Sequence, residues 1–153
     1  MQIPDTTAQE AQRRASDPIL QAQKAWRSAS SLAEHKDALR KEAAARRTKH
    51  ARKPVTYDGH KYDADVEAQQ KLVGKLTYAQ AAGKDTDSTW SVEWKTAGND
   101  FVQLSYTDLE NVVQAVNNQI QAAYDREAEI LAQIEQATTI EELNAISIES
   151  GWP

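Results

Sequence analysis

The chain has 153 residues with a formal net charge of −5, and 40% of its residues are hydrophobic and 27% charged. This length favours one domain of ordinary size, and the lack of cysteine excludes disulfide scaffolds, thiolate metal sites and cysteine nucleophiles. Apolar runs are only a few residues long and the first 14 residues are polar. We therefore expect no membrane span and no secretory signal.

Charge is divided unevenly along the chain. Residues 1–53 hold 12 of the 18 Lys and Arg and 6 of the 23 Asp and Glu, a net charge of +6. Residues 54–153 hold the remainder, a net charge of −11. Such a division is typical of a basic segment that binds nucleic acid, or of one that lies on an acidic surface of its own chain or of a neighbour.

The first third of the chain is predicted to be helical. Thr7 and Glu10 have the spacing of a capping box, and Asp17 followed by Pro18 is a stronger helix start. Residues 19–50 contain no Gly or Pro and are rich in helix-forming residues, but their apolar stripe is thin. Because a helix this polar gains little by packing on its own core, we expect a long arm that is exposed or bound to a partner.

Eight residues of this arm are predicted to bind the partner. Trp26 is the central one, because tryptophan buries a large rigid area and is enriched among interface hot spots. The other apolar residues would add burial, and the arginines would contact an acidic surface. The eight residues are Ile19, Trp26, Leu32, Leu39, Arg40, Arg46, Arg47 and Arg52.

Two β-hairpins are predicted after the arm. The first has Asp58-Gly59 between short β-prone segments, which is typical of a two-residue hairpin turn. The second has period-two alternation over residues 90–94, which is typical of a half-buried strand and places Trp90 and Trp94 on the same face, in the core.

Three helices are predicted in the same region. Asp65 can cap the first, over residues 66–82. The second starts at a capping box on Thr107, and its apolar stripe reaches Ala137 with one interruption at Glu127, which predicts a long helix packed along another helix. Thr139 caps a short third helix. The stripes expected to point inward are Val66, Leu72, Val73 and Leu76, and then Leu109, Val113, Val116, Ile120, Ala123, Ile130, Ile134 and Ala137.

The predicted fold class is therefore α+β. Residues 1–53 form a long N-terminal helical arm, and residues 54–153 form a small domain of two short β-hairpins packed on two main helices plus a short C-terminal helix. The thin, alanine-rich stripe of the arm favours close helix packing in a homo-oligomer.

No motif of enzyme chemistry is found. The sequence has no glycine-rich phosphate loop and no nucleophile elbow, and its three histidines have no ligand spacing. The best metal candidate is the acidic cluster Asp58, Asp63, Asp65 and Glu67, but Ala68 stands where a calcium loop needs glycine and a helix is expected to begin at once. We therefore expect a protein that is not an enzyme and that holds no metal or cofactor.

Several turn and core positions carry a resemblance to a known family. They are the string Val55-x-Tyr57-x-Gly59-x-x-Tyr62-x-Ala64-Asp65, the tryptophans at 90 and 94, Gly98-Asn99-Asp100, and the ending Gly151-Trp152-Pro153. From Val55 onward, the chain resembles an uncharacterised domain family of bacteriophage proteins that is often encoded near tail-fibre genes. The resemblance implies synthesis in the host cytoplasm, a place in the virion tail, and fibre or baseplate proteins as partners. It implies no catalytic residues.

These observations predict a non-enzymatic structural protein of a bacteriophage tail that attaches or organises tail fibres or the baseplate through its helical arm. One alternative is a tail-fibre assembly chaperone that is absent from the virion. Another is a nucleic-acid-binding protein that uses the basic helix, with an affinity that falls steeply with salt. The acidic remainder of the chain and the lack of interleaved aromatic residues oppose this second alternative.

Overall fold

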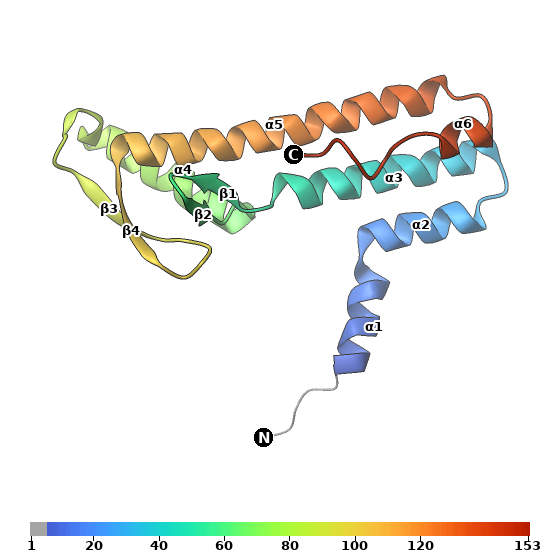
Figure 1. The fold of residues 1–153 in the computed structure, drawn as a ribbon, viewed down its shortest axis with the longest axis horizontal. Helices are drawn as coiled ribbons and strands as arrows, with labels where there is room; N and C mark the ends of the chain where they lie inside the picture. Colours follow the sequence, from blue (N-terminus) through green and yellow to red (C-terminus); the bar gives the residue numbers. More distant parts are fainter. Residues whose placement is uncertain (1–5) are drawn as a thin grey trace. The chain divides into compact units, whose positions relative to one another are not determined.

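The computed structural model describes residues 6–153 as six α-helices, one short 3-10 helix and two separate two-stranded antiparallel sheets (Figure 1). This confirms the predicted α+β class. The elements are α1 (Thr6–Ser16), α2 (Pro18–Ser28), α3 (Leu32–Ala51), β1 (Val55–Tyr57), β2 (His60–Tyr62), α4 (Val66–Ala81), η1 (Lys84–Thr86), β3 (Ser91–Lys95), β4 (Phe101–Ser105), α5 (Tyr106–Gln136) and α6 (Ile140–Asn144).

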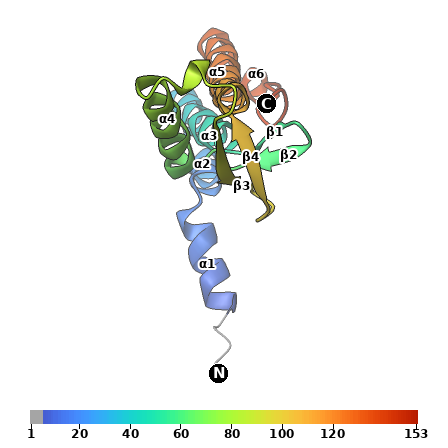
Figure 2. The same cartoon turned by 90° about the vertical axis from the view of Figure 1, so that its left-hand side faces the viewer.

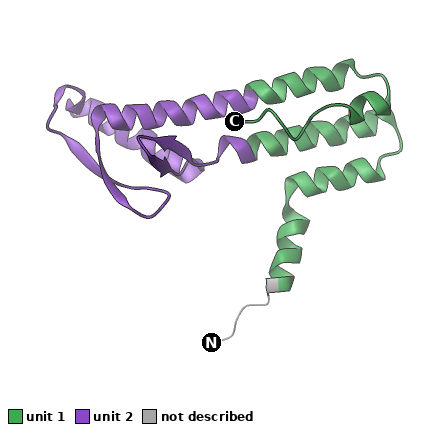
Figure 3. Ribbon diagram, in the orientation of Figure 1, with its two compact units in different colours: residues 1–48, 125–152 green, residues 49–124, 153 purple. Residues whose placement is uncertain are grey.

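The chain divides into two compact units (Figure 3). The first unit combines residues 1–48 with 125–152, and the second holds residues 49–124 and Pro153. Helices α3 and α5 each run through both units. The expected boundary after residue 53 is thus replaced by a division in which most of the N-terminal third belongs with the C-terminal segment.

The helical segment of residues 19–50 consists of two helices, because the chain is capped at a second start. The Ser31 hydroxyl accepts a hydrogen bond from the Glu34 backbone N–H at 3.2 Å. The Glu34 carboxylate in turn accepts one from the Ser30 backbone N–H at 2.7 Å. These bonds satisfy N–H groups that a new helix leaves free, so the Ser31-x-x-Glu34 pattern ends one helix and starts the next.

The core of the first unit joins the N-terminal third to the C-terminal helices. Leu39 and Ala43 of α3 are buried with residues of α5 and α6. Trp26 and Leu32 are partly buried against the same cluster. The buried members are Leu39, Ala43, Ile130, Ile134, Ala137 and Leu143. Leu39 is thus buried within its own unit, and Trp26 and Leu32 are partly buried there, so these three residues do not form the uncovered apolar face that was expected.

Arg126 holds the C-terminal loop of the first unit. Its guanidinium donates to the backbone carbonyls of Ser150 at 3.0 Å and Ser147 at 2.7 Å. Gly151 has a φ of +82°, and a Cβ at this position would lie 2.7 Å from the Arg126 side chain. The left-handed backbone conformation favours glycine here, and a larger residue would also push the Arg126 side chain aside. Trp152 then packs partly against the core, and its indole N–H donates to the Ile148 backbone carbonyl at 2.8 Å.

Both predicted hairpins are confirmed in the second unit. Asp58 and Gly59 have φ values of +46° and +77° and join β1 to β2, as an Asp-Gly turn with two left-handed residues does. Strands β3 and β4 lie side by side with Val92 opposite Leu104 and Trp94 opposite Val102 (Figure 2). Those four side chains belong to or pack on the core, and the alternate positions face outward.

The core of the second unit gathers residues from both hairpins, α4 and α5. Tyr62 is the largest of its fully buried side chains, with 1% of its surface exposed. The buried members are Val55, Tyr62, Ala64, Leu72, Leu104, Leu109, Val112 and Val116, and Trp90 and Trp94 pack against them. The predicted core role of both tryptophans is therefore confirmed.

Helix α4 is turned differently from the prediction. Asp65 caps it as expected, accepting from the Ala68 N–H at 2.8 Å, and Leu72 is buried. Val66 and Val73, however, are 46% and 51% exposed. The core contacts Leu72 and Ala79, which are seven residues apart and thus share one face. The two valines lie on another face and were wrongly assigned to the core.

Helix α5 begins two residues earlier than its predicted capping box implies. Ser105, and not Thr107, precedes the helix, and its hydroxyl accepts from the Asp108 N–H at 3.1 Å. The Asp108 carboxylate accepts from the Ser105 N–H at 2.9 Å. The reciprocal bonds form a capping box with aspartate in the place of the usual glutamate.

Candidate partner-binding surface

The basic face of α3 is largely neutralised by carboxylates of its own unit. Arg40 lies 3.2 Å from Glu135 of α5, and Arg47 forms a salt bridge with Glu127. Glu127 is the residue that interrupts the apolar stripe of α5. The apolar stripe of α5 is thus interrupted at the residue that forms an ion pair with α3.

Arg46 is held by a buried carboxylate on its own helix. Two of its guanidinium nitrogens donate to Glu42 Oε1 at 3.0 and 2.9 Å, and only 5% of the Glu42 surface is exposed. Gln23 of α2 donates to the same oxygen at 3.3 Å, and Glu149 lies 3.7 Å from the guanidinium. A paired, hydrogen-bonded carboxylate of this kind is tolerated inside a protein. The Arg46–Glu42 pair therefore links α3 to α2 through Gln23 and to the C-terminal loop through Glu149.

A cleft lies beside Trp26 between α2, α3 and the C-terminal loop. Its apolar walls include Leu39, Ile146 and Ile148, and Arg27 contributes charge at the rim. The Trp26 ring also meets the His35 ring edge-on, with 4.4 Å between the ring centroids. Trp26 is thus a wall of its own unit. The sequence signal that could have indicated this packing is the group of apolar residues near the C-terminus, Ile146, Ile148 and Trp152.

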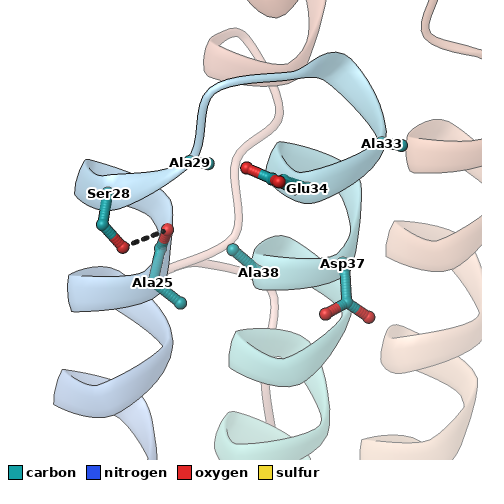
Figure 4. Close-up of a pocket in the computed structure, with 7 residues that line it drawn as sticks. All are labelled: Ala25, Ser28, Ala29, Ala33, Glu34, Asp37 and Ala38. Carbon is teal, nitrogen blue, oxygen red and sulfur yellow. Dashed lines mark hydrogen bonds between the residues drawn. The ribbon is translucent and has the colours of Figure 1, made fainter.

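A second hollow separates α2 from α3 and is lined mainly by alanines (Figure 4). The lining residues are Ala25, Ser28, Ala29, Ala33, Glu34, Asp37 and Ala38. Its two carboxylates are already in use. Hydrogen bonds from the Ser30 backbone and hydroxyl hold the pKa of Glu34 below its usual value, and Asp37 pairs with Lys41 at 2.9 Å. The hollow therefore offers no free charged group of its own.

Two of the eight predicted residues do not belong to this packed set. Ile19 is half-buried near the start of α2, and Arg52 is exposed just beyond the end of α3. The structure thus brings Trp26, Leu32 and Leu39 to one core and places Arg40, Arg46 and Arg47 in ion pairs. The eight residues do not form one open surface.

Helix α1 is the segment whose surface remains open. Every residue from Thr7 to Ser16 is exposed. Its surface combines Ala8, Ala11 and Ala15 with two cations, Arg13 and Arg14, in its last turn. An isolated helix of about 11 residues is marginal in water, because nucleation costs more than a few turns return. Within the described residues, α1 has no buried face to stabilise it.

A polar network ties the first hairpin to α5 in the second unit. The Tyr57 hydroxyl donates to Asp108 at 2.8 Å and accepts from the Asn111 amide at 3.2 Å. Hydrogen bonds from the Ser105 backbone, and then from Tyr57, hold the pKa of Asp108 below its usual value against the opposing effect of burial. The network positions the hairpin and the helix start, and each of its groups has a structural partner.

Neither a metal centre nor a membrane span is found in the part of the chain that the structure describes. Over residues 6–153, no group of three His, Asp or Glu is arranged to hold a metal ion. The helices within the same range are all too short or too polar to cross a bilayer.

Comparison with known proteins identifies the family. The model of the family described as "Domain of unknown function (DUF4376)" matches residues 34–147, which is about three quarters of the chain. The chain belongs to this family. The DUF4376 match begins inside α3 and ends just after α6, so that α1 and α2 precede it. No curated protein and no solved structure matches the chain.

The DUF4376 match covers only part of the N-terminal third, and Trp26 and Leu32, which pack against the core, precede it. Leu39, Arg40, Arg46 and Arg47 lie inside the match, where they pack against or pair with their own chain. Helix α1 lies outside it and is the exposed part of the first unit.

Proposed function

We propose that this DUF4376 protein is a non-enzymatic structural component of a bacteriophage tail that attaches fibre or baseplate proteins through α1. The tail assignment is supported by the resemblance of the chain from Val55 onward to phage tail-region proteins. The observation that carries the attachment is the complete exposure of α1 from Thr7 to Ser16. A short helix with no face buried on its own chain gains most of its stability when a partner covers it.

The chemistry of α1 indicates the kind of surface it binds. Ala8, Ala11 and Ala15 are small and permit close helix approach, and Arg13 and Arg14 offer charge to an acidic rim. The partner expected from this pattern is a protein that presents a groove between helices, with carboxylates at one end of the groove. The proposed partner-binding segment is therefore α1 alone and not the whole predicted arm, because α2 and α3 pack in the core of the first unit.

The basic face of α3 offers little support for nucleic-acid binding. Arg40, Arg46 and Arg47 are each paired with a glutamate of their own unit. Phosphate contact by these three arginines would require breaking those pairs, and Trp26 is packed against the core, where it is not free to stack on bases.

Deletion of residues 1–16 is expected to abolish partner binding without unfolding the protein. The protein is captured from infected cells as the full chain, as the deletion, and as Ala11→Pro, which breaks α1 at constant charge. Both altered chains should lose the tail proteins that the full chain retains, while their thermal unfolding should change little because every residue of α1 from Thr7 to Ser16 is exposed. Ala11→Ser is the matched control and should bind normally.

If the shortened chain keeps every partner, α1 is not the anchor. Mass spectrometry of purified virions separates the structural protein from an assembly chaperone. The proposal predicts that the protein is present in virions. Its presence in infected cells together with its absence from virions would support the chaperone.

A further inference from the structure

Helix α4 has an exposed face that carries no charge along its whole length. Val66 and Val73 are 46% and 51% exposed on this face. The absence of charge there contrasts with the whole chain, in which 27% of the residues are charged. The three charged residues of α4, Glu67, Lys71 and Lys75, lie to one side of it by helical spacing. The face consists of Val66, Gln70, Val73, Gly74, Thr77 and Ala81, all of them exposed.

Gly74 has no reason to be glycine within its own chain. It lies in the interior of α4, where glycine is a poor helix former. A Cβ added at Gly74 would meet nothing within 4 Å, and its backbone is not in the left-handed region. A glycine on an exposed helix face does permit the backbone of another segment to approach closely. Val73, beside it, also lines a shallow groove with Val113 and Asn117 of α5.

The order of residues on this face indicates that a second copy of α4 can pack against it. The midpoint of α4 falls between Val73 and Gly74. When a second α4 is laid antiparallel about this midpoint, each valine meets a small residue and the two polar residues meet each other. The opposed positions are Val66 with Ala81, Gln70 with Thr77, and Val73 with Gly74. The face is therefore complementary to itself in size and polarity.

We propose that two copies of this chain associate through α4, antiparallel and about a two-fold axis that passes beside Val73 and Gly74. A two-fold contact uses the same patch on both partners, so an uncharged patch avoids the like-charge repulsion that a charged one would create. The antiparallel arrangement also places opposite ends of the two helix dipoles together. This α4 contact involves neither α1 nor the tail partners.

The test compares leucine substitutions at two exposed positions of α4 in the full chain. Gly74→Leu places a large side chain at the crossing point, whereas the single copy has open space there. Lys71→Leu is the matched control off the uncharged face. Molar mass is measured by light scattering after size exclusion over a concentration series, together with the thermal midpoint. We expect a dimer for the native chain and for Lys71→Leu. Gly74→Leu should raise the dissociation constant of the dimer about tenfold or more. At concentrations where the native chain and this variant are both monomeric, the thermal midpoint of the variant should not be lower than that of the native chain.

A second measurement uses the absence of cysteine in the native chain. Gly74→Cys should form a disulfide-linked dimer rapidly under mild oxidation, and Lys71→Cys should form it slowly. A native chain that stays monomeric at about 100 μM, where a dissociation constant in the micromolar range gives mostly dimer, would overturn the proposal. A dimer that Gly74→Leu leaves intact would overturn it as well.

Discussion

Replacement of Ile134 by alanine is expected to lower the free energy of unfolding by about 2–5 kcal/mol, because it removes a fully buried side chain and leaves a cavity. Ile134 has 0% of its surface exposed and lies in the cluster that contains Leu39 and Ala43 of α3. The loss is measured by denaturant unfolding followed by circular dichroism.

Ile140 provides the matched control for this substitution. It is the same residue type six positions further along, and it is 37% exposed at the start of α6. Ile140→Ala should cost less than about 1 kcal/mol, since partly exposed side chains lose little on truncation. Equal losses for the two variants would contradict the burial of Ile134 in this cluster.

Asp108→Ala is expected to cost about 1–2 kcal/mol at neutral pH, because it removes the carboxylate that accepts from the Ser105 backbone N–H in the capping box and from the Tyr57 hydroxyl. The pKa of Asp108 is lowered in the folded protein, chiefly by the hydrogen bond from the Ser105 backbone. The carboxylate therefore contributes its full stability above its unfolded pKa. This contribution is lost as the pH falls through the lower, folded pKa.

The same measurement over pH distinguishes the carboxylate from the rest of the side chain. The stability difference between the native chain and Asp108→Ala should shrink as the solution is acidified from neutral pH to below the usual aspartate pKa of about 4. Glu110→Ala, an exposed change two residues along the helix, should stay within about 0.5 kcal/mol of the native chain. A difference for Asp108→Ala that is constant with pH would contradict the proposed role of its charge.

Local chemistry made the second unit largely predictable. The Asp58-Gly59 turn, the Asp65 cap and the alternation around Trp94 each act within a few residues, so they are readable without knowledge of the fold. The wrong assignments in this region have local causes. In the capping box that begins at Ser105, Asp108 stands where glutamate is usual. In α4, the hydrophobic Val66 and Val73 face away from the core.

The candidate surface was less predictable, because its contacts join distant segments. The ion pair between Arg47 and Glu127 depends on how α3 lies along α5 and not on either sequence by itself. The apolar stripe of α2 and α3 seemed thin because alanines make up much of it. Ala22, Ala38 and Ala43 are nevertheless buried, since small side chains let helices approach closely. Only α1 keeps the openness that was expected of the whole arm.

The central claim is that the N-terminal third, apart from α1, is part of the protein's own core. Hydrogen exchange of the free, full-length chain tests it most directly, because exchange reports the opening of each backbone segment. Amides of α3 around Leu39–Ala43 should exchange as slowly as those of α5 around Ile130–Ile134, and amides of residues 7–16 should exchange rapidly. Rapid exchange throughout α3 in the free protein would contradict the claim and would restore the whole arm as a surface that needs a partner.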